Sequence, residues 1–191
     1  MIEAELKARV TDPEALRVAL VERAGEPESA TYTDVYLDRG GELAAEGREL
    51  RVRAIDTSAG RRVILTYKGA AVDEATGSKP EHETETADRD ALLAVLGGLG
   101  YARTIEFTKQ CSNYRWQAGD RSVLATVVSV PELDGTFVEI ETMADVDDVP
   151  AALDELRALL AGLGVQADAL TTELYTDAVS ARRSQAEPFL E

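Results

Sequence analysis

The chain has 191 residues, of which 45% are hydrophobic and 29% charged, so it is long enough for one domain with a sizeable core. The formal net charge of −16 argues against a nucleic-acid-binding surface and against binding to anionic membranes. One cysteine and one histidine exclude an intrachain disulfide and argue against a His-rich metal site or a Ser-His-Asp triad. With no signal peptide at the N-terminus and no long apolar run, we expect a cytoplasmic protein.

Helices are predicted from caps and apolar stripes in three segments. The first begins at Asp12-Pro13, the second at Asp88, and the third near Asp147. A short fourth helix is expected over residues 172–179. We interpret residues 1–180 as a single domain and residues 181–191 as a disordered, polar C-terminal tail.

Most of the remaining chain has the composition and turn spacing of β-strands. The predicted strands are Ile2–Val10, Tyr32–Leu37, Glu49–Ile55, Arg62–Lys68, Glu81–Thr86, Thr104–Trp116, Ser122–Val130 and Thr136–Thr142.

Several of these strands alternate strictly between apolar and charged residues. In the opening EAELK, Glu3, Glu5 and Lys7 share one face, and in LRVR, Arg51 and Arg53 do. One such strand alone is typical of a half-buried sheet with its polar face in water. Three amphipathic helices, however, need a surface to cover. If they pack on the apolar faces, the charged faces must line the concave side of a closed α+β barrel.

A charged lumen is costly unless its charges are paired or bound to a ligand. Here, both signs are present. Carboxylates that could hold divalent cations are Glu3, Glu5, Glu139 and Glu141. Cations that could hold a polyanion are Lys7, Arg51, Arg53, Lys68, Lys109 and Arg115. Carboxylates for a metal beside a cradle of cations suit phosphoryl transfer, and a triphosphate matches that number of cations.

The chain resembles the CYTH superfamily, also called triphosphate tunnel metalloenzymes, which includes class IV adenylyl cyclases and thiamine triphosphatases. The matching segments, in order, are EAELK, DVYLDR, LRVR, LTYKG, EHETET, FTKQC, FVEIE and TELYTDAV. Their order and spacing are most similar to the short bacterial class IV cyclases. The resemblance implies a closed antiparallel eight-stranded β-barrel with a charged lumen and helices outside, and it makes a homodimer a candidate assembly.

The resemblance also implies roles for the charged residues. It implies Mg²⁺ or Mn²⁺ on Glu3, Glu5, Glu139 and Glu141. It implies contacts to a triphosphate such as ATP from Lys7, Arg51, Arg53, Lys68 and Lys109, to which we add Arg115. We expect Lys7, Glu139 and Glu141 to act as catalytic residues.

The chain departs from the family pattern at two positions. Where the family usually has Lys-x-Arg, this chain has Lys109 followed by Cys111. Arg115 has the same parity and could substitute, but it lies roughly 13 Å further along a strand. Where the family usually has an Asp, this chain has Val128 or Ser129, and the nearest acid is Asp134.

Three functions remain open at this point. One is a class IV-type adenylyl cyclase that converts ATP to cyclic AMP and pyrophosphate. Another is a tunnel triphosphatase that hydrolyses thiamine triphosphate, inorganic triphosphate or a nucleotide. The third, motivated by the two departures, is a protein of this fold that has lost phosphoryl transfer and binds or converts another ligand.

Overall fold

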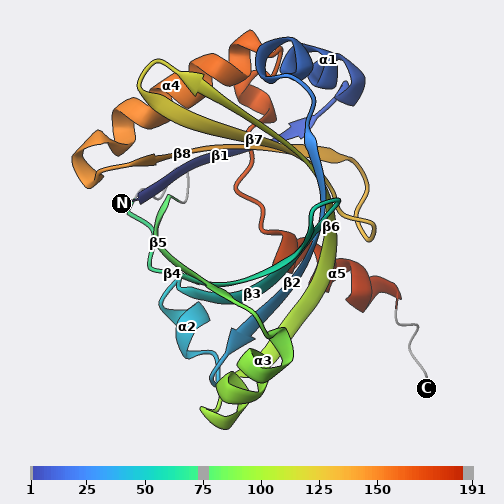
Figure 1. Ribbon diagram of the computed structural model, residues 1–191, viewed down its shortest axis with the longest axis vertical. Helices are drawn as coiled ribbons and strands as arrows, with labels where there is room; N and C mark the ends of the chain where they lie inside the picture. The colour runs from blue at the N-terminus through green and yellow to red at the C-terminus, as the bar shows by residue number, and fades with distance from the viewer. Residues whose placement is uncertain (1, 73–77, 187–191) are drawn as a thin grey trace.

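A computed structural model describes residues 2–72 and 78–186. In this part of the chain, eight strands close into an antiparallel barrel with the order β1-β5-β4-β3-β2-β6-β7-β8 (Figure 1). The strands are β1 (Ile2–Val10), β2 (Glu28–Asp38), β3 (Glu49–Thr57), β4 (Gly60–Lys68), β5 (Lys79–Thr86), β6 (Ala102–Ala118), β7 (Arg121–Ser129) and β8 (Thr136–Ala144). The predicted fold class and every predicted strand are confirmed, with ends that differ by zero to four residues.

The helices pack outside the barrel, as the amphipathic patterns predict (Figure 1). They are α1 (Pro13–Ala24), α2 (Glu42–Ala45), α3 (Arg89–Gly98), α4 (Val149–Gly162) and α5 (Tyr175–Ala186), with single 3-10 turns η1 (Val146–Asp148) and η2 (Ala167–Ala169). The Asp12 carboxylate caps α1 by accepting the Ala15 N–H at 3.0 Å, and Asp88 caps α3 by accepting the Ala91 N–H at 2.9 Å.

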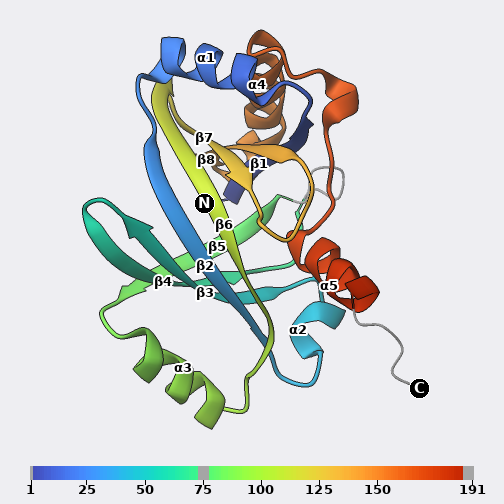
Figure 2. The same ribbon diagram turned by 90° about the vertical axis from the view of Figure 1, so that its right-hand side faces the viewer.

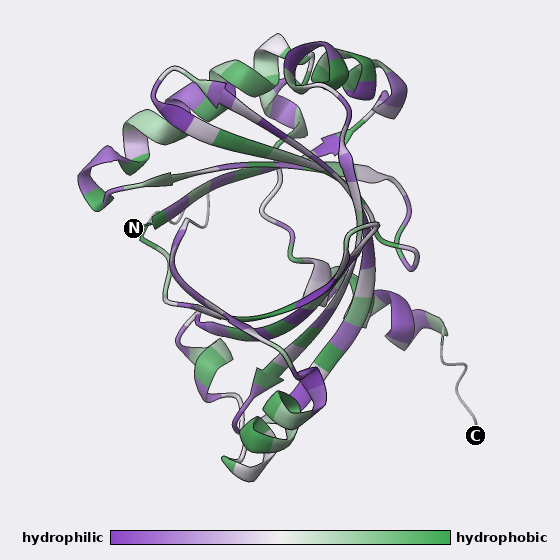
Figure 3. Cartoon of the chain, in the orientation of Figure 1, coloured by the Kyte–Doolittle hydropathy of each residue, from purple (hydrophilic) through white to green (hydrophobic). Residues whose placement is uncertain are grey.

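Two hydrophobic cores join these helices to the outer face of the sheet. Leu16 and Leu20 of α1 and Leu153 and Leu156 of α4 pack on β1, β7 and β8. On the opposite side, α2 and α3 pack on β2, β3 and β4. The strands alternate between hydrophilic and hydrophobic residues along their length (Figure 3). The apolar half of each alternation is therefore turned outward, and the charged half is left for the lumen.

Two elements differ from the sequence prediction. The one-turn helix α2 is too short to show an apolar stripe in the sequence. It forms where the Asp38 carboxylate accepts hydrogen bonds from the backbone N–H groups of Leu43 and Ala44. The fourth helix continues to Ala186, so residues 181–186 are helical where a tail was expected. Val179 is fully buried, and Arg183 pairs with Glu132 at 2.7 Å, which fastens the helix to the barrel. Residues 187–191 lie outside the described part of the chain.

The C-terminal half of β1 pairs with a segment that follows α4. β1 pairs with β8 along its whole length but with β5 only at Ile2 and Glu3. Further along β1, the Thr171 N–H donates to the Lys7 carbonyl at 2.9 Å, and Leu170 bridges Ala8. The chain then crosses one end of the barrel to reach α5 (Figures 1 and 2). This crossing brings residues 171–176 against the lumen.

Candidate functional site

The lumen is a cavity of about 340 Å³ walled by charged side chains. All ten site residues expected from the sequence line it: Glu3, Glu5, Lys7, Arg51, Arg53, Lys68, Lys109, Arg115, Glu139 and Glu141. The register of β1 and β8 sets Glu5 opposite Glu141 and Lys7 opposite Glu139. Residues at alternate positions of each strand thus point into the lumen, and closure of the barrel brings those of different strands onto one surface.

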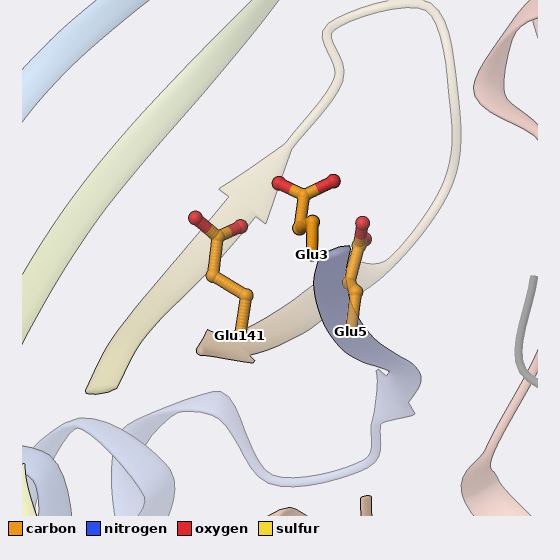
Figure 4. Close-up of side chains that lie close together, drawn as sticks. All are labelled: Glu3, Glu5 and Glu141. Atoms are coloured by element: carbon orange, nitrogen blue, oxygen red, sulfur yellow. The ribbon is translucent and has the colours of Figure 1, made fainter. Parts of the chain in front are cut away.

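Three carboxylates converge from β1 and β8. Oxygens of Glu3, Glu5 and Glu141 all lie within 4.8 Å of one another (Figure 4). Glu139, the fourth carboxylate expected at a metal, stands outside this group. It lies two residues before Glu141 on β8, and Lys109 Nζ lies 3.4 Å from its carboxylate. The structure therefore divides the predicted four-carboxylate set into a group of three and a carboxylate paired with lysine.

The pKa values of the three convergent carboxylates reflect their crowding. Burial and the neighbouring Glu3 raise the pKa of Glu5 to about 6, and burial with Glu3 and Glu5 holds the pKa of Glu141 well above its ordinary value. Burial alone would raise the pKa of Glu3, but Lys68 outweighs it, and the pKa is lowered. Three oxygen donors, one buried and two half-buried, with excess negative charge fit a hard divalent cation such as Mg²⁺ or Mn²⁺.

Lys68 connects the carboxylates of β1 with those of β5. It forms a close ion pair with Glu3, and its Nζ lies 3.9 Å from Glu5 and 3.8 Å from Glu81. Burial and the nearby Glu3 raise the pKa of Glu81 to about 8, although Lys68 opposes the shift. Lys68 is therefore already neutralised beside the carboxylate group.

The two arginines of β3 have different partners. Arg53 makes a bidentate ion pair with Asp34, at 2.7 and 2.8 Å, and its guanidinium lies 4.5 Å from the centre of the Tyr32 ring. Arg51 has a buried Nε with no partner among the described residues, and its Nη2 is 3.8 Å from the nearest carboxylate oxygen. Arg51 Nη2 also donates to the Thr66 hydroxyl at 3.2 Å and lies 3.8 Å from Glu83. Arg51 is therefore held less tightly than Arg53, and its Nε remains as a donor for an anion.

Asp34 is a buried lumen residue that the sequence patterns did not single out. Its side chain is fully buried, and although burial opposes ionisation, Arg53 holds its pKa well below the usual range. The signal was available, because Asp34 lies in the quoted DVYLDR segment on the lumen parity of β2. Its pairing with Arg53 requires the β2–β3 register, which the sequence does not show.

Tyr175, at the start of α5, lies between two of the expected phosphate ligands. The ammonium groups of Lys7 and Lys109 are 4.5 and 4.3 Å from the centre of its ring. Burial and the adjacent Glu139 raise the pKa of Tyr175, so its hydroxyl stays protonated. The two lysines and Glu139 therefore form, with Tyr175, a second cluster deeper in the lumen than the three carboxylates.

Residues 1–175 match the family model of the CYTH domain. This match spans most of the chain and agrees with the closed barrel and its charged lumen. The protein belongs to the CYTH domain family.

Relatives of this CYTH protein come from archaea, bacteria and plants. A Methanocaldococcus jannaschii protein named "Putative adenylate cyclase" is 23% identical over 183 residues, which cover 93% of this chain and 98% of the relative. The PH1819 protein of Pyrococcus horikoshii has the same fold, with a TM-score of 0.83, 27% identity, and coverage of 95% and 99% of the two chains. HpAC1 of Hippeastrum, described as having a dominant triphosphatase activity, has a TM-score of 0.59 and 19% identity, with coverage of 100% and 99%.

Of the two positions expected for the missing Asp, Val128 lies beside Cys111, whereas Ser129 lies opposite Gln110. Cys111 and Val128 are cross-strand partners on β6 and β7, and both are buried. Phe137 is the partner of Val128 on β8, so the row continues as an apolar surface. Burial raises the pKa of the Cys111 thiol to about 12. Two neutral side chains therefore occupy these paired positions, so neither position holds a buried charge without a partner.

Neither Arg115 nor Asp134 lies beside Cys111 and Val128. Arg115 lies near the C-terminal end of β6, where it is exposed at the mouth of the lumen. Asp134 is in the β7–β8 turn, where its side chain is 96% exposed and lies 3.9 Å from Arg182. In the described part of the chain, no helix is both long and apolar enough to cross a lipid bilayer.

Proposed function

We propose that this CYTH protein is a metal-dependent enzyme that acts on a triphosphate, with adenylyl cyclase activity as its reaction. The observation that carries the proposal is the position of the Glu3, Glu5 and Glu141 group beside Lys7, Arg51 and Lys109 in one cavity. Carboxylates for a metal and cations for phosphate are both required for phosphoryl transfer. A relative named as an adenylate cyclase supports the choice of reaction.

The residues of the lumen have distinct tasks in this reaction. Glu3, Glu5 and Glu141 would hold Mg²⁺ or Mn²⁺, which supplies Lewis-acid stabilisation of charge on the phosphate oxygens. Arg51, Lys7 and Lys109 bind the β- and γ-phosphates and stabilise the charge that develops on the leaving group. The ribose 3′-oxygen forms a bond to the α-phosphorus and loses its proton to solvent. The bond from the α-phosphorus to the bridging oxygen breaks, and pyrophosphate leaves.

A second candidate is triphosphate hydrolysis, favoured by the activity described for the Hippeastrum protein. The same cations would hold the substrate, but water would attack the γ-phosphorus. The Cys111–Val128 pair favours a third outcome, in which the lumen has lost phosphoryl transfer and takes another ligand.

One experiment separates these candidates. The purified protein is incubated with ATP and Mg²⁺ or Mn²⁺ between pH 7 and 10, and the products are resolved by phosphorus NMR. Cyclic AMP with pyrophosphate, absent in a Glu3→Ala/Glu5→Ala variant, is the expected result. ADP with phosphate would establish the hydrolase instead. Unchanged ATP would overturn both activities.

A further inference from the structure

Strand β5 has a partner strand on only one side along most of its length. It pairs with β4 over residues 81–86, but with β1 only at Lys79 and Pro80. The two strands β1 and β5 begin together near the N-terminus and then run apart (Figure 1). In the part of the chain that the structure describes, no other strand pairs with this side of β5. Residues 81–86 therefore form a free sheet edge, which we call the β5 edge.

The register of β5 determines which of its backbone groups point away from β4. The Gly69 N–H donates to the Pro80 carbonyl at 2.9 Å, so the backbone of Pro80 faces β4. In an antiparallel ladder the N–H and C=O groups of successive residues point to opposite sides, and the β4–β5 register runs without a shift. The N–H and C=O groups of Glu81, Glu83 and Glu85 therefore point out of the β5 edge. Such an edge is a template for pairing with another extended chain.

The side chains along the β5 edge carry negative charge. The side chains of Glu83 and Glu85 are 45% and 53% exposed. The Glu83 carboxylate accepts a hydrogen bond from the Thr66 hydroxyl at 2.7 Å, and the Arg51 guanidinium lies 3.8 Å from it. Arg62 pairs with Glu85 at 2.9 Å, but this pair lies in solvent, where screening weakens it. The edge thus keeps a negative potential that favours a cationic partner.

The β5 edge also borders the lumen. Glu83 lines the lumen cavity, and so does Leu174 of the segment that crosses the end of the barrel. On the other face of β5, His82 and Thr84 are exposed. Side chains of a strand point alternately to its two faces. A strand added to β5 would therefore direct one set of side chains toward the opening of the lumen and the other toward solvent.

A second copy of this chain is a poor occupant of the β5 edge. Two identical edges that pair antiparallel about a twofold axis keep the same face of each sheet on the same side. Glu83 and Glu85 would then lie opposite glutamates of the other copy in the registers that pair most of the edge. Like charges directly opposite one another destabilise such a pairing. The same row of carboxylates favours a strand with lysine or arginine at alternate positions.

We propose that the β5 edge docks an extended segment of a basic protein partner, which adds as an antiparallel strand with Lys or Arg opposite Glu83 and Glu85. Hydrogen bonds between the two backbones supply affinity, and the alternating charges supply selectivity. The docking surface uses none of the three convergent carboxylates and none of the lumen lysines. The proposal therefore does not depend on the triphosphate function.

Fluorescence anisotropy with labelled, end-capped peptides at about 150 mM salt tests the proposal. The probe is the peptide TKVKVKVT. The peptide TEVEVEVT reverses its charge, and a third peptide is the probe with each lysine methylated at its backbone nitrogen. The third peptide keeps every charge but lacks the N–H groups that would face the β5 edge. We expect the wild-type protein to bind the probe at micromolar concentrations and each of the other peptides at least about tenfold more weakly.

Two sets of variants test the edge from the protein side. Glu85→Pro removes an N–H that points away from β4, so the β4–β5 ladder is kept, and Glu85→Ala is the matched variant that retains this N–H. Glu85→Pro should bind the probe about fivefold more weakly than Glu85→Ala does. Glu83→Lys/Glu85→Lys should reverse the preference, so that TEVEVEVT binds more tightly than the probe. Glu14→Lys/Glu22→Lys makes the same change in net charge on α1 and should keep the wild-type preference.

Hydrogen exchange of the wild-type protein locates the site without any variant. The probe should slow amide exchange within residues 79–86 about tenfold or more and leave α1 unchanged. Equal affinity for the probe and its N-methylated form would mean charge attraction without strand addition, and it would overturn the proposal. Protection elsewhere in the chain, or no binding of the probe, would do the same. So would a dimer in sedimentation experiments that Glu85→Pro abolishes, because the edge would then belong to a second copy.

Discussion

Asp34 and Arg53 show how single residues in this lumen are stabilised. The pair is bidentate and almost fully removed from water, so each partner depends on the other for its charge. Removing one partner of such a pair leaves the other charge buried and unpaired in a medium of low polarity. The pair also rests against the Tyr32 ring, whose hydroxyl accepts a hydrogen bond from Asn113 at 2.9 Å. We infer a structural role for Asp34, with Arg53 contributing positive potential to the lumen.

Asp34→Asn is expected to destabilise the protein by about 3 kcal/mol near pH 6. Because the folded-state pKa of Asp34 is lowered, its stabilisation is present above the unfolded value near 4 and is lost as the pH falls below it. The difference in unfolding free energy between wild type and variant should therefore shrink from pH 5 to pH 3. Urea unfolding followed by circular dichroism measures this difference.

The matched control is Asp56→Asn, which removes the partner of Arg61 at the protein surface. Its effect should be much smaller, because solvent screens an exposed pair. If both variants lost the same stability at pH 6, burial of the Asp34 pair would not be the source of its strength.

Helix α5 is an element whose stability depends on docking. Its 12 residues are near the limit at which an isolated helix is marginal in water, and its sequence lacks a broad apolar stripe. Two buried side chains, Tyr175 and Val179, attach it to the end of the barrel. The helix should therefore unfold locally when this contact is lost.

Val179→Asp is expected to increase amide hydrogen exchange throughout residues 175–186 by at least about tenfold, with little change in α1 or α4. A charge at this fully buried position must leave the apolar contact or remain unpaired. Ser180→Asp adds the same charge one residue away, on the exposed side of α5, and should keep the wild-type pattern. Hydrogen exchange followed by mass spectrometry measures the exchange rates of the helices in both variants. Retained protection in Val179→Asp would mean that α5 is stable without docking.

At the scale of the whole molecule, the closed barrel concentrates like charges that an open sheet would hold apart. Glu3 and Glu5 come from the start of the chain and Glu141 from the last strand, yet their oxygens lie within 4.8 Å. Without a cation, this arrangement opposes folding. A bound cation would be shared by carboxylates of β1 and β8, and it would therefore link the first and last strands of the barrel.

Mn²⁺ at about one hundred times its dissociation constant should stabilise the protein by about 2.7 kcal/mol, which raises Tm by roughly 5–10 °C for a chain of this length. Glu141→Gln should raise the Tm of the metal-free protein, because it removes one of three crowded charges, and should abolish most of the response to Mn²⁺. Differential scanning calorimetry follows both effects.

Glu83→Gln is the control, since Glu83 lines the lumen outside the group of three and accepts a hydrogen bond from Thr66 at 2.7 Å. It should retain the full response to Mn²⁺. A Glu141→Gln variant with an unchanged metal response would place the cation elsewhere.

Local patterns in the sequence were sufficient for most of the fold. The alternation in EAELK and LRVR predicted which side chains face inward, because side-chain direction in a strand repeats every two residues. Asp12 and Asp88 predicted the starts of α1 and α3, because capping needs only neighbours in sequence. The ends of α5 and the single turn α2 were not predictable in the same way, since both depend on contacts with distant strands.

The sequence by itself determined that this protein has a barrel whose lumen carries carboxylates and cations, because that information lies in the parity of each strand. Only the tertiary structure decided which charges meet: Glu141 with Glu3 and Glu5, Asp34 with Arg53, and Cys111 with Val128. It also placed Arg115 at the mouth of the lumen, where it lines the same cavity as the other expected cations. The alternation of side chains along a strand is a local property. These contacts between charged and neutral side chains depend instead on the register between strands and on closure of the barrel, which arise from pairings between residues far apart in the chain.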